Sequence, residues 1–318
     1  MVLTCTPSLL TRIIACLAVA ALTLAGAAPP LTPQSPDTAS DRNTKGAPDA
    51  MRIVSLGGSV TEIVYALGAG DAVVGVDASS LYPEAARELP DVGYFRRVPA
   101  EGVLSLEPTV VLASAETGPP ETLDQLRSAG VEVYVIPEES SVDGARQKIR
   151  SIASVLDRRE AADRLIREME EELEEARRLR SSTDREPRVL FVYARGAGTM
   201  QVAGRGTSAE AMIELAGARN AITGFDGFKP MSAESVAAAE PDVILMLDRG
   251  LDSIGGIEGL LEEPGIALTP AGENRRIVAM DDLLMLSFGP RLGEAVKTLT
   301  RKLHPELEST SESVRPGE

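Results

Sequence analysis

The sequence has no tryptophan, one histidine and only two cysteines, both within the first sixteen residues. The lone histidine, His304, excludes zinc sites built from several histidines and argues against histidine-dependent catalytic triads. Because Cys5 and Cys16 lie at the N-terminus, the rest of the chain has no disulfide, no thiolate cluster and no cysteine nucleophile. Most familiar catalytic chemistry is therefore excluded.

Positive charge is scarce as well. The chain has 32 lysines and arginines against 48 acidic residues, a formal net charge of −16 at pH 7. Nucleic-acid binding needs clustered basic side chains to neutralise phosphates, so we expect no nucleic-acid partner. With 43% hydrophobic residues, the 318-residue chain has globular composition and is long enough for two modest lobes or one large α/β domain.

The N-terminal segment has the pattern of an export signal. Arg12 is followed by the apolar run Ile13–Leu24 and then by the small residues Ala25-Gly26-Ala27. We therefore predict a cleaved signal peptide over residues 1–27. The alternative, a lipoprotein anchored at Cys16, would leave almost no apolar core before the modified cysteine, so we favour cleavage and an exported protein.

Short apolar strands alternate with helical stretches on both sides of a long helical pattern, which predicts an α/β fold with parallel sheets. Near the start, Ser59-Val60-Thr61-Glu62 is predicted to be a capping box. From Asp143 to about Arg180, apolar residues at spacings of three and four predict one continuous helix. The predicted order is a signal peptide (1–27), a disordered leader (28–50), an N-terminal lobe (51–142), a long connecting helix (143–181), a C-terminal lobe (187–304) and a disordered tail (305–318).

An internal repeat relates the two halves. Ala100–Leu112 matches Ala233–Leu245 without gaps, at a constant offset of 133 residues, and each copy predicts a short helix, a Glu-Pro stop and a buried strand. Two related halves imply a ligand-binding cleft between them. The repeat also pairs Glu101 with Glu234, each early in its helix. Such a carboxylate stabilises the helix dipole by ~0.3–1 kcal/mol, or it meets a cationic pocket on a dimeric partner.

Nucleotide-binding motifs are missing. Gly68-Ala69-Gly70 and Gly196-Ala197-Gly198 begin like dinucleotide fingerprints, but neither has the third glycine three residues on, and there is no Walker loop. We therefore expect no nucleotide cofactor.

Four segments resemble the periplasmic haemin-binding proteins of bacterial haem ABC importers, with vitamin B12-binding and siderophore-binding proteins as more distant siblings. They are Arg52–Glu62, Val74–Asp77 continuing through Tyr82-Pro83, Val92-Gly93-Tyr94 and Ala203–Thr207. The resemblance covers roughly residues 51–304. It implies the fold of a class III periplasmic binding protein, in which two Rossmann-like lobes are joined by a long rigid backbone helix.

The resemblance also implies a function. The chain would be a monomeric, non-enzymatic carrier that captures haem in the cleft and delivers it to a dimeric inner-membrane ABC permease with its ATPase. Glu101 and Glu234 match the docking glutamates of the family, which meet arginines on the two permease subunits. Haem is then the transported ligand, and the protein is expected in the periplasm.

Tyr82 matches the family tyrosine that ligates the haem iron, and a phenolate is a hard anion suited to ferric iron. Some relatives carry a histidine where this sequence has Arg195, so we expect a single axial ligand. As a hypothesis, Arg195 and Arg205 in the C-terminal lobe and Arg96 or Arg97 in the N-terminal lobe pair with the haem propionates; the alternative for each is an ordinary surface arginine. The apolar residues Met280, Met285, Leu286 and Phe288 are candidates to pack the porphyrin face, although Met and Phe at such spacing belong more often to the core.

Two alternatives stay open. A corrinoid or ferric-siderophore carrier of the same superfamily would use Tyr82 only for stacking or hydrogen bonding. An exported α/β enzyme working through carboxylates belongs to a different class, and it is disfavoured because no nucleophile–base pair is identifiable.

Overall fold

The computed structural model describes residues 51–196 and 200–307. The predicted signal peptide, the predicted leader and residues 308–318 of the predicted tail lie outside this range. The first residues of that tail are described and are packed, since the carboxylate of Glu306 accepts a hydrogen bond from Thr183 Oγ1 at 3.1 Å. No helix of the described residues has the length and apolarity that crossing a membrane would need.

The N-terminal lobe contains a four-stranded parallel sheet in the order β2-β1-β3-β4, as the strand–helix alternation predicted. The strands are β1 (Ile53–Leu56), β2 (Val73–Val76), β3 (Val110–Ser114) and β4 (Glu132–Ile136). The helices of this lobe are α1 (Gly58–Ala66), α2 (Ala100–Leu104) and α3 (Pro120–Ser128), with the short 3₁₀-helices η1 (Gly70–Ala72), η2 (Glu84–Glu88) and η3 (Phe95–Arg97).

The predicted capping box at Ser59 is wrong. Helix α1 begins directly after Gly57, which makes no side-chain cap, and Ser59 already lies inside the helix. Gly57 has a φ of 114°, a conformation that glycine adopts without a steric penalty. The chain can therefore turn sharply from β1 into α1.

The predicted long connecting helix is in fact two helices, α4 (Val142–Leu156) and α5 (Arg159–Arg180). Asp157 interrupts them with a left-handed φ of 53°, a conformation that no helix can continue through. The apolar spacing breaks at the adjacent Arg158-Arg159-Glu160. Helix α5 alone leads to the C-terminal lobe.

The sheet of the C-terminal lobe is mixed, which corrects the prediction of a second parallel sheet. Its strand order is β10-β9-β5-β6-β8, with β7 pairing β5 separately, and β6 runs antiparallel to both β5 and β8. The strands are β5 (Arg188–Ala194), β6 (Met200–Ala203), β7 (Arg219–Asn220), β8 (Phe228–Pro230), β9 (Val243–Leu247) and β10 (Ile277–Met280).

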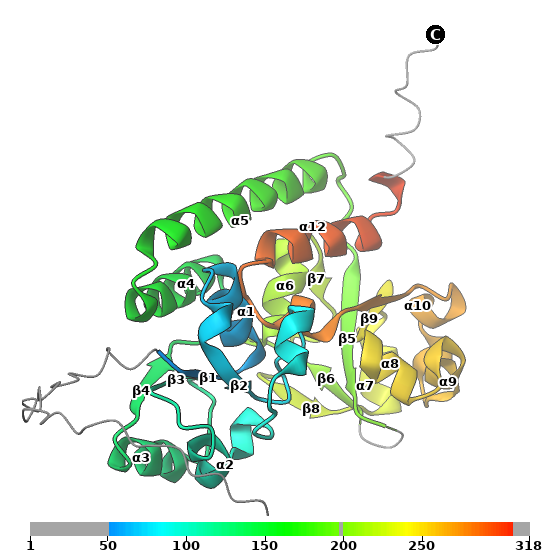
Figure 1. The fold of residues 1–318 in the computed structure, drawn as a ribbon. Coiled ribbons are helices and arrows are strands. Elements are labelled where there is room, and N and C mark those ends of the chain that lie inside the picture. The colour runs from blue at the N-terminus through cyan, green and yellow to red at the C-terminus, as the bar shows by residue number, and fades with distance from the viewer. Residues whose placement is uncertain (1–50, 197–199, 308–318) are drawn as a thin grey trace, which may run out of the picture. The chain divides into compact units, whose positions relative to one another are not determined.

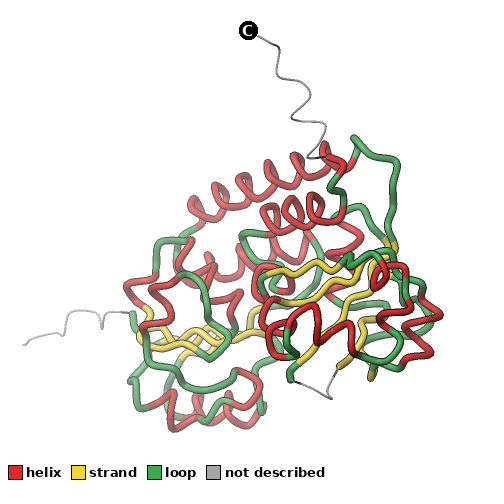
Figure 2. The backbone as a smooth tube through the Cα atoms, turned by 90° about the vertical axis from the view of Figure 1, so that its right-hand side faces the viewer, coloured by secondary structure: helices red, strands yellow, loops and turns green. Residues whose placement is uncertain are grey.

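Helix α12 follows the last strand and packs along α5, as the ribbon of Figure 1 shows. In Figure 2 this pair of helices covers one side of the strands. The helices of the C-terminal lobe are α6 (Ser208–Leu215), α7 (Ala233–Ala239), α8 (Asp248–Ser253), α9 (Gly256–Glu262), α10 (Pro270–Glu273), α11 (Asp282–Leu286) and α12 (Leu292–Leu303), with the 3₁₀-helix η4 (Ile266–Leu268).

Alternate residues of the strands enter different apolar clusters, because successive side chains of a strand point to opposite faces of its sheet. In β1, Ile53 belongs to a large cluster that continues through α4, α5 and α12 to Phe191 of β5. Leu56 of β1 and Leu190 of β5 instead enter two smaller clusters, one in each lobe. The lobes therefore share one continuous core through the connecting helices.

Both copies of the repeat form the predicted helix, corner and strand. Helix α2 leads into β3 and helix α7 into β9. At the Glu-Pro stop of each copy the glutamate has a left-handed conformation, with a φ of 48° at Glu107 and 40° at Glu240. The sequence match at an offset of 133 residues is thus a match of backbone path.

Candidate functional site

The loop that carries Tyr82 leaves the end of β2 and is held by one buried carboxylate. Asp77 accepts hydrogen bonds from the backbone N–H groups of Gly57 and Ser79 at 2.8 and 2.9 Å. It also accepts from the hydroxyl groups of Ser79 and Ser80 at 2.7 and 2.9 Å. A buried carboxylate with this many donors fixes the backbone around it. The loop is therefore a defined support for the residues that follow.

Glycine is required where this loop passes over the start of α1. A Cβ atom added at Gly58 would lie 2.5 Å from the carbonyl oxygen of Ser79 and 2.6 Å from a methyl group of Leu283. Leu283 belongs to α11, so this point is also one where the C-terminal lobe contacts the N-terminal lobe. The backbone of α1 can approach both neighbours only because position 58 has no side chain.

Tyr82 itself is 45% exposed, which is unusual for so large a side chain. Its ring is covered on one face by Arg291, whose Cζ lies 3.8 Å from the ring centroid. Arg291 immediately precedes α12, so a residue of the C-terminal lobe contacts the predicted iron ligand of the N-terminal lobe. The structure thus places Tyr82 where the two lobes meet.

Arg291 is anchored by Glu62 of α1, which is only 2% exposed. The Nε and Nη2 groups of the arginine donate to the two carboxylate oxygens of Glu62 at 2.7 and 3.3 Å. Burial raises the pKa of Glu62 above its ordinary value, while the hydrogen bond from Arg291 acts in the opposite direction. Neither residue was predicted as part of the site.

A second tyrosine–arginine contact between the lobes involves Arg195, which follows β5. Its Cζ lies 5.9 Å from the ring centroid of Tyr94 in the N-terminal lobe and 5.4 Å from that of Tyr193 in the C-terminal lobe. Phe95 and Phe228 contact these tyrosines edge to face. The predicted propionate candidate Arg195 is therefore set among aromatic rings from both lobes.

The other arginines predicted to pair with propionates differ in their partners. Arg96 forms an ion pair with Glu116, and Arg205 donates to Asp226 at 3.0 Å. Arg97 is exposed and makes no such pair within the described part of the chain. All three remain predictions, and Arg97 is the one whose guanidinium has no carboxylate on it.

Met285 was predicted to contact the porphyrin, but the structure places it elsewhere. Its side chain is fully buried within the large shared cluster, together with Met280 and Phe288. A residue in that position contributes packing to the core and shows no surface to a ligand. The prediction of a porphyrin contact at Met285 is not favoured by this placement.

Glu101 and Glu234 lie where the repeat placed them, in the first turns of α2 and α7. Both side chains are exposed. Within residues 51–196 and 200–307 neither makes an ion pair or a side-chain hydrogen bond, so each carboxylate is available to a partner.

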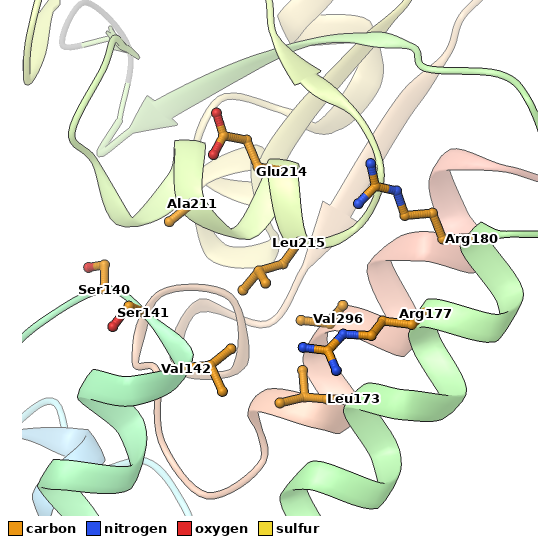
Figure 3. A pocket seen from close by; sticks show the side chains of 10 residues that line it. All are labelled: Ser140, Ser141, Val142, Leu173, Arg177, Arg180, Ala211, Glu214, Leu215 and Val296. Carbon is orange, nitrogen blue, oxygen red and sulfur yellow. The ribbon is translucent and has the colours of Figure 1, made fainter.

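A separate hollow of about 330 Å³ lies between α4, α5, α6 and α12. Figure 3 shows the guanidinium groups of Arg177 and Arg180 directed into it from α5, beside the apolar side chains of Leu173, Leu215 and Val296. None of the predicted site residues lines it. We therefore locate the candidate site at the contact of Tyr82 with Arg291 and the contact of Tyr94 with Arg195.

Comparison with known proteins gives a consistent result. The family described as periplasmic binding protein matches residues 53–284. The solved structure of the periplasmic haem-binding protein RhuT from Roseiflexus sp. RS-1 is 49% identical, with a TM-score of 0.79, over 81% of this chain and 99% of that one. The structure of the periplasmic haem-binding protein BhuT in complex with two haems is 45% identical, with a TM-score of 0.77, over 80% of this chain and 98% of that one.

The curated relatives that match over most of this chain are less similar. A substrate-binding lipoprotein of an ABC transporter from Bacillus subtilis, named YvrC and uncharacterised, is 28% identical over 86% of both chains. The vitamin B12-binding protein of Vibrio campbellii is 25% identical over 65% of this chain and 74% of its own length.

Proposed function

This chain belongs to the periplasmic binding protein family, and from that premise we propose that it captures haem between its two lobes and delivers it to an ABC permease. The comparisons favour haem over a corrinoid. Proteins named for haem binding are 34–49% identical over about four fifths of this chain. The vitamin B12-binding protein of Vibrio campbellii reaches 25% over a shorter stretch.

The observation that carries the proposal is the phenol of Tyr82. It stands on a loop fixed by Asp77, it is exposed, and it faces the C-terminal lobe. In our proposal the phenolate oxygen binds ferric iron directly, and the phenol proton is released to solvent. A hard anionic oxygen is a suitable ligand for this metal.

The other side of the haem is proposed to lack a protein ligand for iron. Arg195 stands between Tyr94 and Tyr193, where an arginine can pair with a propionate but cannot ligate a metal through a neutral nitrogen. Arg97 is the candidate for propionate pairing from the N-terminal lobe. The complex should therefore hold five-coordinate, high-spin ferric haem.

We also propose how the carrier reaches and meets its partner. Residues 1–27 act as a cleaved export signal, and the mature protein works as a monomer in the periplasm. Glu101 and Glu234 dock on the two subunits of the permease, one from each lobe. The alternative of a lipid anchor at Cys16 gains some support from the relative named as a lipoprotein, and mass spectrometry of the mature N-terminus would distinguish the two.

Titration of the purified protein with haemin, followed by absorption spectroscopy, tests the function. We expect a high-spin spectrum typical of tyrosinate ligation, which Tyr82→Phe should abolish with a loss of affinity of at least about a hundredfold. Tyr134→Phe is the matched control, because Tyr134 is also exposed but lies on β4 and donates to Glu132. Iron-free protoporphyrin should bind far more weakly than haemin. If Tyr82→Phe kept both spectrum and affinity, or if cyanocobalamin bound more tightly than haemin, the proposal would be wrong.

A further inference from the structure

The hollow between α4, α5, α6 and α12 has about 330 Å³, a volume within the range of small-molecule pockets. We propose that it binds a small amphipathic carboxylate, with the charged end at Arg177 and Arg180 and the apolar chain against α6 and α12. This binding needs neither haem nor any residue assigned above to haem binding or docking, because none of those residues lines the hollow.

The cationic end of the hollow is formed by the last turns of α5, from which both guanidinium groups are directed into it (Figure 3). The side chain of Arg180 makes no ion pair or hydrogen bond within residues 51–196 and 200–307. Arg177 has only a loose ion pair, with 3.5 Å between its Nη1 atom and Oε2 of Glu174. Guanidinium groups that face one hollow without a tight partner favour an anion there, because each has several donors to offer.

Positive charge exceeds negative charge around this end, although the chain as a whole has a net charge of −16. Glu174 is shared by two arginines, because Nε of Arg178 also lies 3.7 Å from its Oε1 atom. Glu214 lines the hollow but makes no ion pair within the described residues. Figure 3 shows its carboxylate directed away from both guanidinium groups. An incoming carboxylate therefore meets an excess of positive charge.

The side chain of Arg180 is positioned by packing, since no carboxylate holds it. Gly217 follows the C-cap of α6 and has a φ of 84°. A Cβ atom added there would lie 2.7–2.9 Å from Cγ, Cδ and Nε of Arg180. The arginine can lie across the end of α6 only because position 217 has no side chain. The partial negative charge at the C-terminus of α6 also favours a cation at this place. The guanidinium group is thus supported while its donors stay available.

The other walls of the hollow are largely apolar. The apolar side chains that line it come from all four helices and are Val142, Leu173, Ala211, Leu215 and Val296. A ligand with both a charge and an apolar chain fits this combination best. An inorganic anion would leave the apolar wall in contact with water, and a neutral hydrocarbon would leave the two arginines without a partner.

Calorimetric titration of the purified protein with octanoate, at about 0.1 M salt, tests the proposal. We expect one site with a Kd of order 0.1 mM, as is reasonable for a ligand of this size. Acetate has the charge without the chain, and octanol has the chain without the charge. Both should bind at least about tenfold more weakly than octanoate, since each satisfies only one part of the hollow.

Two variants and a matched control locate the binding. Arg180→Gln removes one cation from the hollow, and Ala211→Leu fills the hollow without changing its charge, at a half-buried position where a larger side chain can be accommodated. Each should weaken octanoate binding at least about tenfold. Arg178→Gln removes the same charge from the same helix, but Arg178 is exposed and does not line the hollow. It should change the affinity less than about twofold.

Circular dichroism of each variant checks that the fold is kept. Absence of octanoate binding to the wild-type protein would overturn the proposal. So would octanol binding as tightly as octanoate, because the arginines would then contribute nothing. Wild-type affinity in Ala211→Leu would place the binding elsewhere on the molecule, and an equal loss in Arg178→Gln and Arg180→Gln would show a general effect of charge. Either result would also overturn the proposal.

Discussion

The two copies of the helix–corner–strand repeat follow the same path but are held by different chemistry. In the N-terminal lobe, Arg52 donates to the carbonyl oxygens of Leu106 and Glu107 at 2.7 and 2.9 Å. Its backbone N–H donates to the hydroxyl of Thr109 at 2.9 Å. All three acceptors are neutral.

In the C-terminal lobe the corresponding arginine meets carboxylates. Arg188 donates to Glu240 at 3.1 Å through its side chain and to Asp242 at 2.8 Å through its backbone N–H. The same backbone corner is thus held by neutral acceptors in one lobe and by charged ones in the other. The two copies of the repeat therefore share the path of the backbone, although the hydrogen-bond acceptors that hold each copy differ.

The largest effect should come from replacing the first-turn glutamates that both copies share. Neither glutamate makes an ion pair or a side-chain hydrogen bond within the described chain. We predict that Glu101→Gln and Glu234→Gln each slow haem delivery to the permease about tenfold or more, because each removes one charged contact with the partner. The measurement is haem uptake by liposomes that contain the permease and its ATPase. Haemin affinity in solution should stay unchanged, since neither residue contacts Tyr82. Delivery that depended on only one of the two glutamates would refute the symmetric docking scheme.

The next effect concerns stability and tests whether the two corners are equally well packed. Val103 and Val236 occupy matching positions of the repeat, and both are fully buried, in different apolar clusters. We expect Val103→Ala and Val236→Ala each to lower the free energy of unfolding by about 2 kcal/mol, from lost burial and the cavity left behind. Urea unfolding would measure both. A difference of more than about 1 kcal/mol between them would show that the lobes are packed unequally.

Local signals explain why much of this fold was predictable. The alternation of strands and helices, the repeat and the first-turn glutamates all depend on residues close in sequence, and each is confirmed. The antiparallel strands β6 and β8 were missed for two reasons. Strand β8 has only three residues, Phe228–Pro230, and the apolar run of β6 is interrupted by the polar Gln201. The break at Asp157 was visible only as an irregular spacing, since nothing else nearby marks a left-handed residue.

The site was predictable only in part, for a different physical reason. Tyr82, Glu101 and Glu234 were predicted from motifs, which are local. The pairing of Glu62 with Arg291 joins residues 229 positions apart, and no local pattern records it. The one available sign was that Glu62 directly precedes the apolar Ile63 and Val64 in the predicted helix, because a buried carboxylate requires a cation nearby. Sequence alone could not say which arginine supplies it.

The smallest expected effect comes from removing the charge of Asp242, the carboxylate that stands where the N-terminal copy has the neutral Thr109. Burial acts to raise the pKa of Asp242, but the hydrogen bonds from the backbone and side chain of Arg188 outweigh it, so the pKa is lowered. The ionised form is therefore favoured in the folded protein, and its contribution is present near neutral pH and lost as the pH falls below about 4. Asp242→Asn should cost about 0.5 kcal/mol or less at about pH 6, because the ion pair is partly exposed, and less than that at about pH 3.

The N-terminal corner provides the control for that experiment. Thr109→Val removes the neutral acceptor of Arg52 and should cost about 0.5–1 kcal/mol at both pH values, since no titrating group is involved. Urea unfolding of the two variants beside the wild type, at both pH values, gives the comparison. A cost of Asp242→Asn that did not change with pH would mean that the carboxylate acts only as a hydrogen-bond acceptor, as Thr109 does. The two corners would then be energetically alike despite their different charges.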